Sequence, residues 1–292
     1  MPSALAALDG LSVGDAFGQR FFIDAAIVTR RVAQRALPDG RWWVTDDTWM
    51  ALSVVEVLRR AGRIDQDQLA RSFAGHYHPS RGYGGGMRSL LERLRIGQPW
   101  QEASAAQFDG LGSFGNGGAM RVAPLGAWYA DDVDAAAAEA ARSAAVTHAH
   151  PEGVAGAVAV AVAAALAWQS RDTQIDPTTW LLAIAERTPA GDTAAGIREA
   201  AEVAPDTPIA HAAARLGNGE RLSAMDTVPF SLWMAATREA DFATAMFDTV
   251  SALGDRDTTC AIVGGVLAAR HGRECIPPAW LEHREPLPDW TV

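Results

Sequence analysis

The stretch PEGVAGAVAVAVAAALAWQS at 151–170 decides the fold class of this chain. Alanine and valine lie nearly all round the helix that it would form, which suits a central helix enclosed by other helices. Its longest apolar run, 154–168, is about 15 residues long, whereas crossing a bilayer takes roughly 20. The stretch therefore predicts a buried core helix rather than a membrane span.

Alanine-rich segments recur on both sides of this helix, whereas the alternating pattern of a half-buried strand is almost absent. We therefore predict an all-α fold. The chain has 292 residues and no linker that would divide it, so we expect a single domain over 1–292. The predicted helices are 4–14, 47–60, 66–77, 87–95, 118–128, 133–145, 151–170, 178–187, 193–204, 209–216, 227–238, 241–251 and 258–270.

The composition limits which molecules the chain is expected to bind and the cellular compartment in which it is expected. A net charge of -10 argues against broad binding to nucleic acid or anionic lipid, because both require a basic face. The two cysteines, Cys260 and Cys275, lack zinc-ligand spacing. The N-terminus has no basic n-region and carries Asp9 and Asp15, so a secretory signal is not expected. We expect a cytoplasmic protein that binds a small molecule or a modified protein.

Two short acidic clusters carry the chemistry. TDDT at 45–48 directly precedes an amphipathic helix, where a single Asp or Thr would be an ordinary N-cap. Two adjacent carboxylates exceed what capping requires, and a cation between them would relieve their repulsion. DRDTT at 255–259 has the same construction and also precedes a helix of small residues. Carboxylate and hydroxyl oxygens suit Mg²⁺ or Mn²⁺, and we hypothesise that the two clusters meet in space.

Glycine-rich connections at 82–86 and 110–118 separate the predicted helices. Glycine lets a backbone come close to a ligand, so such loops are natural neighbours of phosphate groups. Taken alone, however, most such glycines only make turns. The amides at the start of the helix predicted after 117 are candidate donors for a diphosphate.

Five motifs resemble those of the ADP-ribosylglycohydrolases of the dinitrogenase-reductase-activating type. They are GLSVGDAFG at 10–18, TDDT at 45–48, RGYGGG at 81–86, FGNGGAMRVAP at 114–124 and GDRDT at 254–258, with THAHP at 147–151 and the closing IPPAWLEHREPLP in support. The resemblance implies a compact single-domain orthogonal helical bundle. It also implies a binuclear Mg²⁺ centre, with Mn²⁺ as an alternative, at the base of an ADP-ribose cleft.

The resemblance also implies roles for individual residues. Its metal ligands match Thr45, Asp46, Asp47, Asp255, Asp257 and Thr258. Its substrate-binding segments match Gly84, Gly85, Gly86, Asn116, Gly117, Gly118, Ala119 and Met120, with His148 lining the cleft and Phe114 on the adenine side. Cleavage at ribose C1″ passes through an oxocarbenium-like state, and Asp46 and Asp257 are the candidates to accept the proton of the attacking water.

Three positions depart from the family pattern. The family often has Glu about seven residues after the Asp of its first motif, where it touches substrate or water, and Phe22 stands there in this chain. Arg256 replaces a small residue or Thr between the two aspartates, and Leu253 replaces a Gly before the Gly-Asp pair. These departures bear on the acid/base assignment and on the choice of substrate.

Three functions are therefore in competition. The first is Mg²⁺-dependent hydrolysis of an ADP-ribosylated protein by a monomeric enzyme. The second is a binding or immunity module that retains the fold with little turnover, an idea prompted by Phe22. The third is hydrolysis of a small metabolite such as O-acetyl-ADP-ribose or a ribosyl phosphate, because a few loop side chains set the linkage chemistry.

Overall fold

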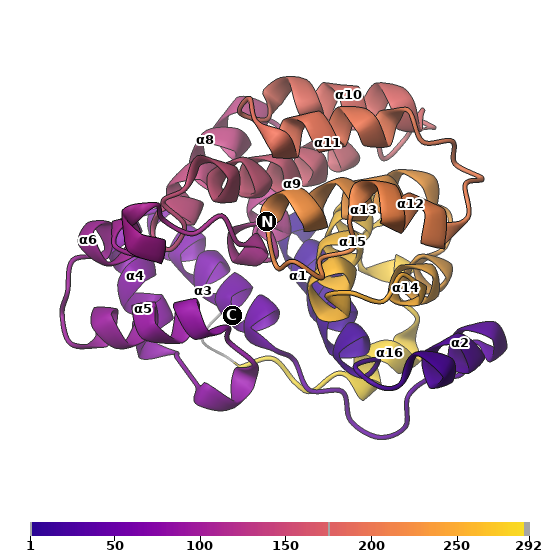
Figure 1. The fold of residues 1–292 in the computed structure, drawn as a ribbon, viewed down its shortest axis with the longest axis horizontal. Coiled ribbons are helices and arrows are strands. Elements are labelled where there is room, and N and C mark those ends of the chain that lie inside the picture. Colours follow the sequence, from indigo (N-terminus) through magenta and orange to yellow (C-terminus); the bar gives the residue numbers. More distant parts are fainter. Residues whose placement is uncertain (1, 175, 289–292) are drawn as a thin grey trace.

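A computed structural model describes residues 2–174 and 176–288, which fold into α-helices and short 3-10 helices (Figure 1). No β-strand forms in these two ranges, so the predicted all-α fold is confirmed. The bounds are α1 Pro2–Gln19, α2 Ala25–Gln34, α3 Asp46–Ala61, α4 Gln66–Gly75, η1 Pro79–Arg81, α5 Gly85–Arg95, α6 Trp100–Ala105, η2 Phe108–Gly110, η3 Asn116–Gly118, α7 Ala123–Trp128, α8 Val133–Ala145, α9 Pro151–Gln169, α10 Pro177–Arg187, α11 Asp192–Ala201, α12 Ile209–Leu216, α13 Ala224–Thr237, α14 Phe242–Ser251, α15 Arg256–His271, η4 Arg273–Cys275 and α16 Pro278–His283.

Helix α9 is the central helix that its composition predicts. It contacts α7, α8, α10, α11, α13 and α15 (Figure 1). By length and composition alone α9 could cross a membrane, but 72% of its most apolar window is buried inside the fold. Small side chains all round the helix let neighbours approach on every side. Its interpretation as a buried core helix is therefore confirmed.

The closest helix pair is α1 with α15, and glycines on α1 make the contact possible. A Cβ on Gly14 would lie 2.1 Å from the carbonyl oxygen of Cys260, and one on Gly18 would lie 2.2 Å from that of Arg256. Gly10 meets the carbonyl of Gly264 in the same way. Because no other residue fits at such distances, this row of glycines brings the C-terminal half of α1 against the start of α15.

The closing segment of the chain returns to support the loop before α3. Trp42 donates a backbone hydrogen bond to the carbonyl of His283, and Glu285 donates one to the carbonyl of Trp42, over 2.8 and 2.9 Å. The Glu285 carboxylate also accepts from the amide of Val44 at 2.9 Å and forms an ion pair with Arg81. This bracing holds 42–44 in place directly before the TDDT motif.

Some helices differ from the sequence-based prediction. The helices α2, α6 and α16 were not predicted: α6 and α16 have only six residues each, and Val28 is the buried residue of α2. The predicted continuous helix 118–128 is wrong, because the chain forms η3, then a turn, and α7 begins only at Ala123. Pro124 lies in the first turn of α7; proline has no N–H to continue a preceding helix.

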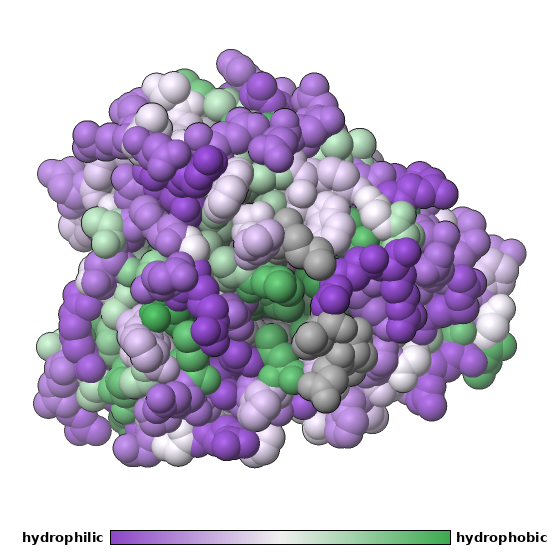
Figure 2. Space-filling model, turned by 180° about the vertical axis from the view of Figure 1, so that it is seen from behind, coloured by the Kyte–Doolittle hydropathy of each residue, from purple (hydrophilic) through white to green (hydrophobic). Residues whose placement is uncertain are grey.

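The surface is mostly hydrophilic although about half of the residues are hydrophobic (Figure 2). Figure 2 shows one face as mostly hydrophilic, with apolar residues gathered in a hollow near its middle. In the described residues, the large apolar side chains that remain exposed include Phe22, Phe108, Phe114 and Leu222. All four of these side chains border the cavities described below.

Candidate active site

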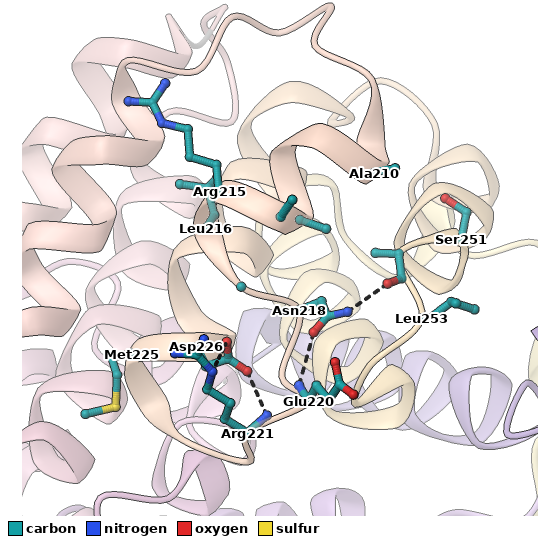
Figure 3. Close-up of a pocket in the computed structure, with 14 residues that line it drawn as sticks. Ala210, Arg215, Leu216, Asn218, Glu220, Arg221, Met225, Asp226, Ser251 and Leu253 are labelled. Atoms are coloured by element: carbon teal, nitrogen blue, oxygen red, sulfur yellow. Dashed lines mark hydrogen bonds and ion pairs between the residues drawn. The ribbon is translucent and has the colours of Figure 1, made fainter.

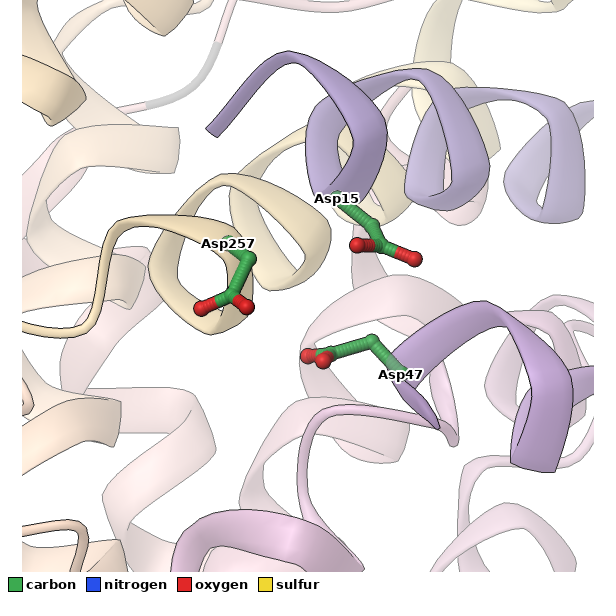
Figure 4. A group of neighbouring side chains, drawn as sticks. All are labelled: Asp15, Asp47 and Asp257. Carbon is green, nitrogen blue, oxygen red and sulfur yellow. The ribbon is translucent and has the colours of Figure 1, made fainter. Parts of the chain in front are cut away.

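The two acidic clusters, far apart in sequence, meet at the N-terminal ends of α3 and α15. Asp46 and Asp47 occupy the first turn of α3, Asp255 is the N-cap of α15, and Asp257 lies in its first turn. Carboxylate oxygens of Asp15, Asp47 and Asp257 all lie within 4.8 Å of one another, and the three side chains point toward a common centre (Figure 4). We call these five aspartates the acidic cluster. The hypothesis that the clusters converge is therefore confirmed.

Asp15 is a member of this cluster that sequence reasoning missed. It lies on α1, is fully buried, and accepts from the amide of Thr45 at 2.9 Å and from the amide of Thr48 at 3.2 Å. The hydroxyls of both threonines also donate to it. Thr45 is the N-cap of α3 but makes no side-chain capping bond within the described chain. Asp15 therefore caps α3 from another helix, and its oxygens are already engaged, so we regard it as a positioning residue rather than a ligand.

The electrostatics of the cluster are unfavourable without a counter-charge. Burial raises the pKa of Asp46 to about 7, with Asp15 and Asp255 adding to the increase and Arg88 opposing it. Burial likewise raises the pKa of Asp15 to about 6. The pKa values of Asp47 and Asp257 rise well above normal because burial and neighbouring aspartates both disfavour their ionised forms. Buried carboxylates at this density are the environment in which a cation binds.

The remaining polar groups of the two clusters are tied into the same network. The Asn116 amide donates to Asp255 at 2.7 Å and to the Thr227 hydroxyl at 3.0 Å, so Asn116 orients Asp255. Burial raises the pKa of Asp255, whereas its hydrogen bond from Asn116 lowers it. The Thr45 hydroxyl lies 2.7 Å from Asp15 and 2.9 Å from Asp47.

A cleft of about 510 Å³ opens above the acidic cluster. Asp46, Asp47, Asp255, Asp257 and Thr258 line its base, while Thr45 is buried. Of the sequence-predicted substrate residues, those lining the cleft are Gly84, Gly85, Gly86, Phe114, Asn116, Gly117, Met120 and His148. Gln107, Phe108, Arg221 and Leu222 also line it and were not predicted. The cleft thus joins both glycine-rich loops to the carboxylates.

Two predicted contacts are not supported. Gly118 and Ala119 are not among the described residues that line the cleft. Gly118 instead packs toward the Gly153 carbonyl on α9. The amides of Ala119 and Met120 donate to the carbonyl of Asn116. These two amides are therefore not free to bind a diphosphate, which corrects the prediction that the amides around 117–120 do so. The backbone amides at the start of α5, at Gly85 on the cleft wall, are the alternative donors.

His148 is a buried donor that faces the cleft. Its Nδ1 lies 2.7 Å from the Thr147 hydroxyl, which accepts from the guanidinium of the fully buried Arg121 at 2.9 Å. The next partner of that hydroxyl, the Ala144 carbonyl, is 3.4 Å away. We assign the hydroxyl proton to Nδ1, the nearer of the two acceptors, which places the ring proton on Nε2. Burial and Arg121 lower the pKa of His148 to about 3, so the ring is neutral at physiological pH.

Two aromatic rings form one end of the cleft. Phe108 and Phe114 stack with centroids 6.1 Å apart and an angle of 27° between their planes. Both rings are partly exposed, at 54% and 39%. Phe108 and the following Asp109 adopt positive φ angles of 50° and 58°, which is an uncommon conformation for residues with a side chain. An exposed aromatic pair of this kind suits a flat, apolar group.

A larger cavity lies elsewhere in the described part of the chain. It measures about 780 Å³ and is walled by α12, the start of α13, the loop between these helices and the C-terminal end of α14 (Figure 3). Its described lining contains no member of the acidic cluster. The same loop nevertheless supports the site, because the Asn218 carbonyl accepts from the amide of Asp255 at 3.1 Å and its side chain donates to Ala252. Chemistry rather than size therefore identifies the candidate active site.

The chain is similar in sequence and in structure to known proteins of one family. The family model for ADP-ribosylglycohydrolase matches residues 2–291. ADP-ribosylhydrolase ARH3 of Gallus gallus is 32% identical, with 81% of this chain and 72% of that protein covered. ADP-ribosylhydrolase ARH3 of Homo sapiens is 30% identical, with 96% and 87% covered. A solved structure described as an ADP-ribosylglycohydrolase-related protein complex superimposes with a TM-score of 0.69 at 26% identity, covering 97% of this chain and 92% of that one.

The fold and these matches define the class of protein as a hydrolase of the ADP-ribosylhydrolase type. The chain belongs to the ADP-ribosylglycohydrolase family, which confirms the resemblance inferred from the five motifs.

Proposed function

We propose that this protein hydrolyses the C1″ glycosidic bond of an ADP-ribosylated substrate and releases ADP-ribose. The observation that carries the proposal is the acidic cluster at the base of a cleft whose other walls are glycine loops and aromatic rings. A cleft of this construction can hold a sugar against carboxylates while backbone amides and rings hold the rest of a dinucleotide-like ligand. Family membership supports the same activity.

We propose two Mg²⁺ ions as cofactors, with Mn²⁺ as an alternative. The donor set fits these ions, because carboxylates and threonine hydroxyls are hard oxygen ligands. The buried Oδ1 of Asp47 has no hydrogen-bond partner within the described chain, as expected of an atom that awaits a ligand. Asp46, Asp47, Asp255, Asp257 and Thr258 would hold the ions from the cleft side. Bound Mg²⁺ would orient the ribose hydroxyls and lower the pKa of a nearby water.

The remaining catalytic and binding roles would fall to residues of the chain itself. Asp46 and Asp257, which line the cleft, are the candidates to accept the proton of the attacking water. Anionic carboxylates below the ribose would stabilise the positive charge that develops on the ring. The His148 Nε2–H would donate to an oxygen of the ligand, and the start of α5 would face the diphosphate. Phe108 and Phe114 would stack with the adenine.

Turnover measurements with matched variants test this proposal. The purified protein would be incubated with ADP-ribosyl-arginine peptides, ADP-ribosyl-serine peptides and O-acetyl-ADP-ribose, with Mg²⁺ or with a chelator. We expect release of ADP-ribose only with the cation, and its loss in Asp46→Ala and Asp257→Ala. Asp172→Ala, at a carboxylate that is 83% exposed, is the matched control.

Two results would contradict the proposal in different ways. If the cluster variants keep full turnover in the presence of the chelator, the metal assignment is wrong. If the wild type binds ADP-ribosylated peptides tightly and releases no ADP-ribose, the chain is a binding module with the fold of an enzyme.

A further inference from the structure

A second groove adjoins the cleft on the opposite side of Leu222 and Asp255. It measures about 420 Å³, and both of these residues line the cleft as well as the groove. Its other walls include Phe22, Leu253, Arg256 and Glu220. We call it the Phe22 groove. Because the cleft and the groove share Leu222 and Asp255, they lie directly beside each other at the carboxylate end of the cleft.

The Phe22 groove presents exposed apolar side chains next to the polar side chains of Asn218, Glu220, Asp255 and Arg256. Phe22 is 47% exposed and Leu222 is 58% exposed. Leu222 has a positive φ of 54°, a strained value for a leucine, and its backbone is held by hydrogen bonds with Gly219 and Asn116. The local backbone therefore keeps an apolar side chain at the boundary between groove and cleft, although burial elsewhere would be more favourable.

Arg256 fixes the Phe22 side of the groove. Its guanidinium lies 5.1 Å from the centre of the Phe22 ring and donates to the carbonyl of Phe21 at 2.7 Å. Phe22, Leu253 and Arg256 thus come from separate parts of the chain and line one groove beside Asp255.

We propose that the Phe22 groove receives the leaving group, and that this group is a peptide with an apolar side chain beside the modified residue. The inference rests on the proposed function. ADP-ribose occupies the cleft, so the group attached to C1″ must leave from the carboxylate end. There the bond between C1″ and the leaving group breaks, the water oxygen bonds to C1″, and the water proton ends on the leaving group.

The chemistry of the walls favours a peptide over a small anionic leaving group. Acetate or phosphate would leave Phe22 and Leu222 in water and would lie beside the carboxylates of Asp255 and Glu220. An apolar side chain would instead cover both exposed walls and remove their surface from water. The guanidinium of Arg256 contacts the Phe22 ring and the Phe21 carbonyl, and the two carboxylates in the same lining offset its positive charge.

Specificity ratios test the proposal. Peptide pairs with the same ADP-ribose linkage, one with Leu and one with Gly beside the modified residue, would be compared by kcat/KM in both arginine-linked and serine-linked series. For the linkage that is cleaved, we expect the wild type to prefer the Leu peptide by about tenfold, the typical effect of one apolar contact in a pocket. Phe22→Ala and Leu222→Gly, the latter suited to a positive φ, should bring the ratio near one.

Ile96→Ala is the matched control, since Ile96 is 85% exposed and is not among the described residues that line the groove or the cleft. It should keep the wild-type ratio. Equal rates for the two wild-type peptides, or a ratio that Phe22→Ala and Leu222→Gly leave unchanged, would overturn the groove assignment alone. Cleavage of O-acetyl-ADP-ribose without cleavage of any peptide would do the same. Failure to cleave any of these substrates would overturn the proposed function, and the groove assignment with it.

Discussion

Replacing Asp47 with Asn tests the acidic cluster through stability as well as activity. Asp47 is 2% exposed and its Oδ1 has no hydrogen-bond partner among the described residues. Asparagine keeps the shape of the side chain, removes one negative charge and can donate to the neighbouring carboxylates. We therefore expect the metal-free Asp47→Asn variant to be more stable than the metal-free wild type at about pH 8, while Mg²⁺-dependent turnover is lost.

The size of the effect follows from the pKa of Asp47 itself. Burial raises this pKa well above its usual value of 3.8, and the neighbouring carboxylates, first that of Asp257, add to the increase. The folded-state pKa therefore lies above the unfolded value, so the folded protein binds this proton more tightly and its stability falls as the pH rises through the folded-state pKa. Each unit of increase corresponds to about 1.36 kcal/mol. Because asparagine carries no charge at any pH, we expect Asp47→Asn to regain about 1–4 kcal/mol at high pH.

The assay is urea unfolding of wild type and Asp47→Asn at about pH 5 and about pH 8, with a chelator and with saturating Mg²⁺. The difference between the two proteins should be large at the higher pH and small at the lower one, where the carboxyls are protonated. Mg²⁺ should stabilise the wild type at the higher pH, by about 2.7 kcal/mol at a hundredfold excess over Kd, and should stabilise the variant much less.

The other titrating groups contribute equally to the stability of the wild type and of Asp47→Asn, so they cancel in the difference between the two proteins. The pKa of His148 is lowered to about 3 in the folded state, so both proteins lose stability as the pH falls below about 6.5. Asp172→Asn, at an exposed carboxylate, should behave as the wild type does. The reasoning is refuted if Asp47→Asn is no more stable than the wild type at the higher pH without metal, or if Mg²⁺ stabilises both proteins equally.

Three further changes test the supports of the site. Thr147→Val removes the hydroxyl that bonds Nδ1 of His148, so ¹⁵N NMR should show a mixture of ring tautomers in place of the Nε2–H form; an unchanged spectrum would contradict the assignment. Gly14→Ala forces a Cβ to within 2.1 Å of a backbone oxygen on α15. This clash should lower the free energy of unfolding by about 1–3 kcal/mol or more. A melting temperature equal to that of the wild type would instead show that α1 and α15 can separate freely. Glu285→Ala leaves the Arg81 guanidinium without its carboxylate partner. We expect it to lower the free energy of unfolding by about 3–5 kcal/mol and to lower kcat. If neither the unfolding curve nor the kinetics changes, the closing segment does not brace the TDDT loop.

The sequence alone predicted most helices and both short acidic clusters, because these signals are local. Alanine and valine all round 151–170 indicate a helix with neighbours on every side, whatever those neighbours are. Likewise, TDDT and DRDTT each precede a helix, and a helix N-terminus is where acidic side chains are stable. The helices that were missed, such as α6 and α16, are too short to show a period.

Other features depended on contacts between distant parts of the chain. A helix start at 117–120 predicted free amides, but only the folded loop reveals that two of them bond to Asn116. Asp15 carried one local signal, a carboxylate between Gly14 and Gly18 in a mostly apolar helix, yet its role as the cap of α3 depends on a helix that begins about 30 residues later.

There is a simple physical reason why some features could be predicted from the sequence and others could not. Hydrogen-bonded helices and their caps form between residues a few positions apart, so residue type and spacing are enough to predict them. The acidic cluster, the Thr147–His148 pair beneath the cleft and the Phe22 groove arise where separate helices pack, and the packing is set by glycine contacts between α1 and α15 and by the return of the closing segment. The sequence thus determined which residues could do chemistry, while the tertiary structure alone decided which of them face one another.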